Sequence, residues 1–442
     1  MIISTRFLLL ATAAIAITCA PAKADVILST LVNFNGPNGD YPKAGLIADA
    51  VGNLYGTTTG TKILPGTNYD GTVYKISAGT HAFSTVYSFS GANDGNPVAG
   101  LITDAAGNLY GTTPNGGANK NGTVFKISAG TNALTTLATF NGTNGKNPYS
   151  GLIADAAGNL FGTTQYGASN DKGTVFKISA GTNALTTLVT FNGTNGDYSV
   201  AGLTADAAGN LYGTTQAGGS TLGSGPNGLG YGTVFEIAAG TNAFTTLHSF
   251  NSADGYQPMG DLLADAAGNL YGTTSAGGAN GYGTIFEIAA GTHAFTTLYS
   301  FSGADGAAPV ADLIIDADGN LYGTTQSGGV TFGSGPNGLG YGTVFKIAAG
   351  SHALTTLYSF SGADGALPGG SLLADSAGNL YGTTQYGGTS FGTATLGLGY
   401  GTVFEISGTG FVVPELGSLS LAMLGGVVLL SGTIVRRRIA GR

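Results

Sequence analysis

The heptapeptide Gly-Asn-Leu-Tyr-Gly-Thr-Thr recurs seven times along the chain and constrains its fold more than any other feature. The copies begin at Gly52, Gly107, Gly158, Gly209, Gly268, Gly319 and Gly378, and only the third departs from the motif, with Phe161 in place of tyrosine. The intervals between them are 51 to 59 residues. A fixed period of this size is typical of chains built from repeated supersecondary units. The sequence therefore predicts seven copies of one unit.

Each unit contains four strand-like runs separated by turn signals. In the second unit the runs are residues 100–104, 109–113, 122–128 and 133–140. Threonine, valine, isoleucine, tyrosine and phenylalanine dominate these runs, as half-buried pleated surfaces require. Between the two ends of the chain no window shows sustained helical periodicity. Each unit is therefore predicted to be one four-stranded antiparallel blade.

The order of the strands along the chain predicts a closed ring. Residues 26–34 match the fourth strand of later units, and the last unit ends after its third strand, at residues 401–407. Pairing the N-terminal strand with that third strand would complete a seventh blade and leave no sheet edge unpaired. We therefore expect an all-β, seven-bladed β-propeller over residues 25–410, closed by its N-terminal strand.

Two positions inside the unit carry further expectations. Gly56 and its equivalents lie within the second strand, where glycine marks a close approach, and we expect an aromatic ring of a neighbouring blade to pack there. The Lys126 position in the third strand is lysine or glutamate in other units. Because either charge is accepted, the pattern predicts a solvated outer strand rather than a ligand site.

The repeated text GLIADAAGNLYGTT followed by GTVFKI resembles the GloVer-type tandem repeat of exported bacterial proteins. The resemblance covers residues 25–407 and recurs seven times in order. It implies an extracellular location and leaves the biochemical role open.

Residues 1–24 have the features of a signal peptide. Arg6 supplies a positive charge, residues 7–17 are apolar, and Ala22 and Ala24 form the small-x-small pattern of a cleavage site. We expect cleavage before Asp25, with an uncleaved membrane anchor as the alternative.

Residues 411–442 have the features of a membrane-sorting tail. Residues 416–435 are uncharged and, as a helix, would extend about 30 Å, the thickness of a bilayer core. Arg436, Arg437 and Arg438 follow and should stay on the cytoplasmic side. With Pro414 and Glu415 before the apolar segment, the order resembles the PEP-CTERM sorting signal. That resemblance implies membrane insertion and processing by an exosortase-like enzyme, although Leu416 replaces the second proline of the motif; a plain C-terminal anchor is the alternative.

Charge and cysteine content exclude several kinds of function. Residues 25–415 contain nine lysines, no arginine and all 23 acidic residues, so this region is strongly negative. Nucleic-acid binding requires clustered basic groups, and we exclude it. The single cysteine, Cys19, lies in the predicted signal peptide. The mature chain would therefore have no disulfide and no thiolate ligand or nucleophile.

No arrangement of acids and histidines in the sequence predicts catalysis. His81, His293 and His352 share a turn position that is asparagine in other units, which favours a structural role. The aspartate that precedes each heptapeptide is expected to cap its own turn. A calcium loop at Asp316 and Asp318 is a less favoured alternative. No G-x-S-x-G motif occurs together with a uniquely placed histidine and acid, and we predict no catalytic residue, no metal ligand, no cofactor and no enzyme activity.

Two further aspartates allow a cation site as an alternative interpretation. Asp261 and Asp312 replace a glycine at the start of the first strand in adjacent units, where they could flank a channel mouth and hold a cation. Solvated carboxylates are the favoured interpretation of this pair.

Loop length gives the strongest indication of a binding surface. The loop after the heptapeptide is long in three units, at residues 216–231, 326–341 and 385–400. In a propeller it emerges on the same face as the loop that links one blade to the next. That face is rich in Asn, Asp, Gln, Tyr and Gly, and the alternative is loop drift without function.

We therefore predict a non-catalytic extracellular or cell-envelope scaffold or adhesion propeller that binds polysaccharide or protein through one loop face. The alternative is a propeller hydrolase or lyase that acts on a sugar or glycan with a channel-bound cation.

The exported chain is expected to begin at Asp25, because the cleavage pattern ends at Ala24. Mass spectrometry of the N-terminal peptide tests this expectation. A mature chain that starts upstream, or one that retains Cys19, would contradict it.

Overall fold

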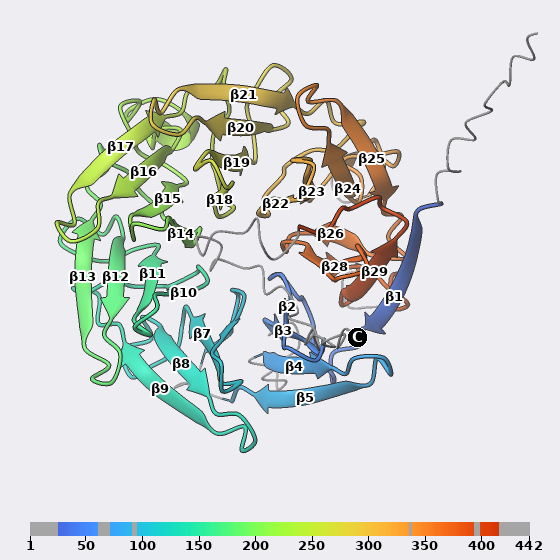
Figure 1. The fold of residues 1–442 in the computed structure, drawn as a ribbon, viewed down its shortest axis with the longest axis horizontal. Coiled ribbons are helices and arrows are strands. Elements are labelled where there is room, and N and C mark those ends of the chain that lie inside the picture. Colours follow the sequence, from blue (N-terminus) through green and yellow to red (C-terminus); the bar gives the residue numbers. More distant parts are fainter. Residues whose placement is uncertain (1–24, 61–70, 91–94, 336–337, 393–397, 415–442) are drawn as a thin grey trace, which may run out of the picture.

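The protein is a ring of seven β-sheets, shown in Figure 1 by a computed structural model that describes residues 25–60, 71–90, 95–335, 338–392 and 398–414. The predicted signal peptide and the segment 416–435 lie outside the described residues. Within those described, no helix is long and apolar enough to cross a membrane. The predicted all-β, seven-bladed propeller of four-stranded antiparallel blades is confirmed.

Each blade has four main strands, here a to d from the axis to the rim (Figure 1). The a strands are β2 (Ile47–Ala48), β6 (Ile102–Thr103), β10 (Ile153–Ala154), β14 (Leu203–Ala205), β18 (Leu263–Ala264), β22 (Ile314–Ile315) and β27 (Leu373–Ala374). The b strands are β3 (Leu54–Thr58), β7 (Leu109–Thr113), β11 (Leu160–Thr164), β15 (Leu211–Thr215), β19 (Leu270–Thr274), β23 (Leu321–Thr325) and β28 (Leu380–Tyr386).

The c strands are β4 (Thr72–Ile76), β8 (Thr123–Ile127), β12 (Thr174–Ile178), β16 (Thr233–Ile237), β20 (Thr284–Ile288), β24 (Thr343–Ile347) and β29 (Thr402–Ser407). The d strands are β5 (Phe83–Ser88), β9 (Leu134–Thr139), β13 (Leu185–Thr190), β17 (Phe244–Ser249), β21 (Phe295–Ser300), β25 (Leu354–Ser359) and β1 (Ile27–Asn33). A short extra strand, β26 (Ala366–Pro368), pairs with β28, and the loop of blade 4 contains the 3-10 turn η1 (Pro226–Gly228).

The N-terminal strand closes the ring as the sequence predicts. β1 pairs antiparallel with β29, from Ile27 opposite Ser407 to Asn33 opposite Thr402. Blade 7 is therefore built from both ends of the described chain, and its β29 edge is covered.

The hydrophobic core lies between the blades rather than inside any one of them. The phenylalanine that follows each d strand packs against the aromatic ring in strand c of the next blade, with ring centroids 5.1 to 5.5 Å apart. The seven pairs are Phe34–Tyr74, Phe89–Phe125, Phe140–Phe176, Phe191–Phe235, Phe250–Phe286, Phe301–Phe345 and Phe360–Phe404. Each ring contributes a large apolar area with a preferred edge-to-face geometry, so these pairs fix the angle between blades.

The glycine inside strand b is explained by an aromatic ring of its own blade, which corrects the expectation of a neighbour's ring. Gly111 lies directly opposite Phe125 across strands β7 and β8. A Cβ atom at Gly111 would lie 2.6 Å from the Phe125 ring, which is too close for two carbon atoms. The missing side chain leaves room for the Phe125 ring, which packs on Phe89 at the end of blade 1.

Strand c is an internal strand, and the prediction of a solvated outer strand was wrong. β8 lies between β7 and β9, and the outer strand is d. Val124 and Phe125 are both buried because a blade packs against each face of the sheet. Lys126 is half-buried, and its Nζ lies 5.8 Å from the centre of the Tyr110 ring on β7.

Deleting residues 25–33 is expected to cause aggregation or to lower the melting temperature by at least about 5 °C, because β29 would become an unpaired edge. Thermal unfolding and size-exclusion chromatography measure both effects. The double substitution Ser29→Ala and Thr30→Ala, at exposed positions of β1, is the matched control and should leave both unchanged. A deletion variant that stays monomeric and melts like the parent would refute closure by β1.

Candidate functional site

The repeated aspartates and histidines have structural roles, as expected. Asp104 Oδ1 accepts hydrogen bonds from the backbone N–H of Ala106 and Asn108, and its Oδ2 accepts from Asn108 Nδ2 and Tyr110 Oη. The same set recurs at Asp316, whose oxygens are thereby used within the turn rather than directed to calcium. His81, His293 and His352 have φ of 52 to 54°, the left-handed conformation that asparagine adopts at this turn in other units.

The two threonines of the heptapeptide also have structural roles. The second threonine of each copy shares a hydrogen bond with a threonine of strand c, as in Thr113 and Thr123 at 2.7 Å. In five of the seven copies the first donates to a backbone carbonyl of the next blade, as from Thr112 Oγ1 to Ser150 O at 2.9 Å. Thr383 makes this bond to Ala44 O at 2.9 Å and so links blade 7 to blade 1. Apart from the first threonine of the copies in blades 4 and 6, the polar side chains of the motif are therefore explained by packing and hydrogen bonding within the ring.

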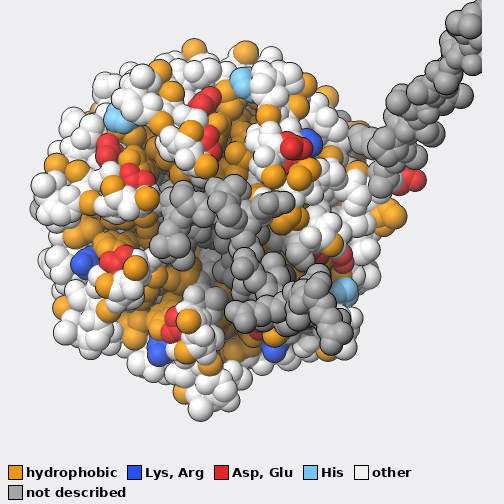
Figure 2. Space-filling view, in the orientation of Figure 1, with side chains coloured by type: hydrophobic (Ala, Val, Ile, Leu, Met, Phe, Trp, Pro, Cys, Tyr) orange, Lys and Arg blue, Asp and Glu red, His pale blue; other side chains and the backbone are white. Residues whose placement is uncertain are grey.

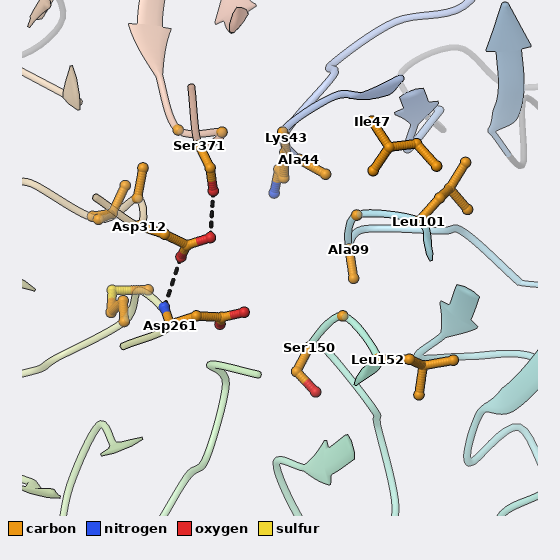
Figure 3. A pocket seen from close by; sticks show the side chains of 18 of the residues that line it. Lys43, Ala44, Ile47, Ala99, Leu101, Ser150, Leu152, Asp261, Asp312 and Ser371 are labelled. Carbon is orange, nitrogen blue, oxygen red and sulfur yellow. Dashed lines mark hydrogen bonds between the residues drawn. The ribbon is translucent and has the colours of Figure 1, made fainter. Parts of the chain in front are cut away.

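A central channel of about 270 Å³ is lined by the beginnings of the a strands of all seven blades. Figure 3 shows Lys43, Asp261, Asp312 and Ser371 among its lining residues. Lys43 extends into the channel from blade 1, and burial lowers the pKa of its ammonium group. Within the described residues, no group of three or more His, Cys, Asp or Glu side chains has the arrangement of a metal site.

Asp261 and Asp312 link blades, which corrects the expectation of solvated carboxylates. Asp312 Oδ1 accepts the backbone N–H of Asp261 at 2.6 Å, and its Oδ2 accepts the hydroxyl of Ser371. Asp261 Oδ1 accepts the backbone N–H of Gly202 in the same manner. Two of the three blade boundaries joined in this way lack the usual threonine bond, because the buried Thr214 and Thr324 hydroxyls have no partner. The carboxylates thus reinforce the ring where the repeated bond is missing.

Burial also changes the titration of this pair. Desolvation raises the pKa of Asp261 well above its usual range, and the nearby Asp312 carboxylate adds to the effect. Burial raises the pKa of Asp312 as well, while its bond from Ser371 opposes the shift.

The face that carries the b–c and d–a loops has the features of a recognition surface. The two kinds of loop meet there through isolated backbone β-bridges, such as Lys146 with Tyr166 and Asp197 with Ala217. The long loops fold back over the preceding blade, and Phe332 packs on Gly303 of a d–a loop. The predicted common face of these loops is therefore observed.

A groove of about 200 Å³ lies on this loop face where blades 3, 4 and 5 meet. We call it the tyrosine groove; it is lined by Gln165, Tyr166, Tyr198, Gln216 and Gln257, with η1 and Leu229 of the long blade 4 loop as one wall. The Tyr166 and Tyr198 rings meet edge to face at 5.1 Å and 87°. Two aromatic rings and several amides that can each donate and accept suit a ligand with many hydroxyl groups.

Buried charge positions Tyr198 in the groove. Asp197 is buried, and its Oδ2 accepts a hydrogen bond from Lys172 Nζ at 2.6 Å. Burial raises the pKa of Asp197, and Lys172 opposes that shift. Lys172 Nζ also lies 5.7 Å from the centre of the Tyr198 ring. Tyr198 itself has φ of 56°, the conformation that Gln257 and Ala308 also adopt at the equivalent position, so this φ belongs to the repeat.

Sequence reasoning correctly placed the b–c and d–a loops on one face but missed the tyrosine groove. The available signal was departure from the repeat, since Tyr166 and Tyr198 occupy positions that hold other residues in most units. The sorting residues Pro414, Glu415, Arg436, Arg437 and Arg438 and the cleavage residues Ala22 and Ala24 stay predictions. Of these only Pro414 lies within the described residues.

The last described residues leave the ring on the opposite face. The backbone N–H of Ala317, in the a–b turn of blade 6, donates to Val412 O at 2.8 Å. Phe411 packs on Tyr322 with a centroid distance of 5.0 Å. Because the a–b turn is at the opposite end of strand a from the d–a loop, the chain departs from the face opposite the tyrosine groove. In the view of Figure 2, acidic side chains recur around the ring rather than forming one patch.

The fold is a seven-bladed β-propeller of four-stranded antiparallel blades, whose b–c and d–a loops meet on one face. The model of the Gloeobacter/Verrucomicrobia repeat matches residues 17–226 and 219–418, and the chain belongs to this family. The GloVer-type interpretation of the sequence is thereby confirmed. No curated protein sequence matches the chain.

Solved structures share the fold at low sequence identity. The extracellular domain of a protein described as a one component system of B. thetaiotaomicron has a TM-score of 0.54 and 10% identity, over 85% of this chain and 39% of that one. A fungal alcohol oxidase of the AA5 family, in complex with copper, has a TM-score of 0.54 and 15% identity, over 85% of this chain and 75% of that one. This chain thus spans well under half of the first structure's length, and these similarities establish the fold alone.

Raising the pH is expected to destabilise the protein through the channel aspartates. A carboxyl group whose pKa is higher in the folded than in the unfolded state contributes stability below the unfolded value of about 3.9, and this contribution is lost as the pH rises through the folded value. Asp261→Asn keeps the acceptor for Gly202 and removes the charge. Its melting temperature should match the parent's at pH 4 and exceed it at pH 8. The exposed Asp318→Asn is the matched control, and an equal pH dependence of D261N and the parent would contradict the argument.

Proposed function

We propose that this protein is a non-catalytic, exported propeller of the cell envelope or extracellular space that binds polysaccharide through its loop face. The tyrosine groove is the observation that carries the proposal. It combines half-buried tyrosine rings, which can pack on the apolar faces of sugars, with glutamine amides, which can donate to and accept from hydroxyl groups. Lys172 is paired with Asp197, so the groove favours uncharged sugar units.

The direction in which the chain leaves the ring supports display of this face. If residues 416–435 insert in a membrane and residues 436–438 stay cytoplasmic, the exit at Val412 would place the a–b turns toward the membrane. The loop face would then point outward. Membrane insertion, the PEP-CTERM-like signal and processing by an exosortase-like enzyme are part of the proposal.

The alternative, a hydrolase or lyase with a channel-bound cation, has weaker support. Two carboxyl groups with raised pKa beside a cavity are an arrangement found in active sites. Here, however, both Asp261 and Asp312 accept hydrogen bonds from the neighbouring blades, which accounts for their positions. A cation observed in the channel with sugar-cleaving activity would favour this alternative.

The full-length chain is expected to bind at least one of cellulose, chitin, xylan and β-1,3-glucan in a sedimentation assay. Tyr198→Asn should weaken that binding about tenfold, which corresponds to about 1.4 kcal/mol. Asparagine is chosen because Asn147 occupies the equivalent d–a position with φ of 53°, so the backbone is not further strained.

The matched control for this experiment is Tyr110→Phe, a substitution that the chain itself contains at Phe161. Tyr110 lies on strand b beside the a–b turn, away from the loop face. Parent protein that binds none of the four polymers, or Y198N that binds as the parent does, would refute the proposed function.

A further inference from the structure

Two sequence fragments that each occur twice in the chain meet twice in the folded ring. Asn-Gly-Asp-Tyr is present only at residues 38–41 and 195–198, and Gln-Tyr-Gly only at residues 165–167 and 385–387. Residues 195–198 and 165–167 both belong to blade 3. Residues 38–41 and 385–387 are far apart in sequence, but both belong to blade 7 because β1 is its outer strand. Closure of the ring therefore brings the two fragments together a second time, in blade 7.

The two copies have the same geometry. Tyr41 and Tyr386 meet edge to face at 4.8 Å and 87°, against 5.1 Å and 87° for Tyr166 and Tyr198. Tyr41 has φ of 52° and Tyr198 has φ of 56°, as the repeat requires at this position, where Gln257 also has 56°. We call the blade 3 set station A and the blade 7 set station B; station A comprises Gln165, Tyr166, Asp197 and Tyr198, and station B comprises Gln385, Tyr386, Asp40 and Tyr41.

The backbone connections of the two tyrosines are those that also occur at other blade boundaries, as at Gln257 and Ala308. The N–H of Tyr198 donates to Lys172 O, and that of Tyr41 donates to Tyr400 O, the equivalent residue of blade 7. The carbonyl of each tyrosine accepts an N–H from the next blade, Gln216 for Tyr198 and Thr59 for Tyr41. Each station therefore lies at a blade boundary, on the loop face.

The stations differ in how open they are. Gln385 and Tyr386 are half-buried, like Gln165 and Tyr166, but Tyr41 is only 7% exposed. Burial raises the pKa of Tyr41 to about 12, and Tyr386 and Asp40 add to the shift. The two stations thus offer the same groups with unequal access, so we expect unequal affinities.

The positions of the stations in the ring are as nearly opposite as seven blades permit. One lies at the boundary of blades 3 and 4 and the other at the boundary of blades 7 and 1, with three blades between them on one side and four on the other. Packed sheets lie about 10 Å apart, so a ring of seven measures about 70 Å around and the stations are on the order of 20 Å apart across it. Two similar sites at this separation suit a ligand that presents the same unit repeatedly.

We propose that stations A and B bind one extended, hydroxyl-rich polysaccharide chain at two points across the loop face. The inference rests on the proposed function. It adds that binding occurs at two points and that the ligand is a polymer of repeating units. Once one station is occupied, the second binds within the same complex, at a high effective concentration. A polysaccharide would then be held much more tightly than a short fragment of it.

The test compares long and short ligands with variants of each station. Tyr166→Ser and Tyr386→Ser remove one half-buried ring each, and Ser327 occupies the equivalent position in blade 6, so the ring tolerates serine there. The full-length parent, Y166S, Y386S and the double variant are titrated with soluble cellulose, chitin, xylan and β-1,3-glucan derivatives, and with the corresponding disaccharides, by calorimetry.

For the polymer that binds, each single variant should lose about tenfold or more in affinity, and the double variant should lose binding. For its disaccharide, which is too short to reach both stations, the parent should bind two molecules and each single variant one. Tyr110→Phe should match the parent in both assays.

The outcomes separate this inference from the proposed function. A parent that binds one disaccharide, with only one of the two variants affected, would overturn bivalence and leave polysaccharide binding intact. A double variant that binds the polymer as the parent does would overturn both. A parent that binds none of the four polymers would refute the proposed function and this inference with it.

Discussion

The fold depends on one contact that is repeated at every blade boundary, the aromatic pair between the end of strand d and strand c of the next blade. In the Phe89 and Phe125 pair, Phe89 is positioned directly after β5. Phe125 fits against its own blade because Gly111 has no side chain to clash with its ring. The hydrogen bond from Thr112 to the next blade then fixes the inner ends of the strands. Each unit of about fifty residues therefore buries its core only when a neighbour is present on both sides, and a closed ring satisfies this condition for all seven.

Much of the fold could be predicted from the sequence because the same pattern of strands and turns recurs in seven repeat units. The number of strands and the match of residues 26–34 to the fourth strand were sufficient to predict closure by β1. The environment of strand c was predicted incorrectly, since the charge at Lys126 indicates exposure for one residue only. Both faces of a blade are buried because other blades pack against them in the ring. The sequence of one strand does not indicate this burial.

The site was harder to predict because its parts are not local. Tyr41 and Tyr386 are separated by most of the chain, and only the pairing of β1 with β29 brings them to one blade. The aspartates Asp261 and Asp312 were correctly placed near the channel, but their bonds to the backbone of the neighbouring blades depend on the radius of the ring. Positions that recur in all units have explained structural roles, so the residues that break the repeat are where function is to be sought.

Closure by β1 also sets an order of events during synthesis. The strand that completes the ring is made first and its partner β29 last, and their pairing joins residues more than 300 positions apart. Contacts of such long range form slowly because the intervening chain must be organised first. Throughout translation β1 is a hydrophobic strand without its partner, and each finished blade exposes one face until the next is made. The growing chain is thus vulnerable to premature association until its final residues emerge, so a factor that shields its beginning would have most effect before the last blade is complete.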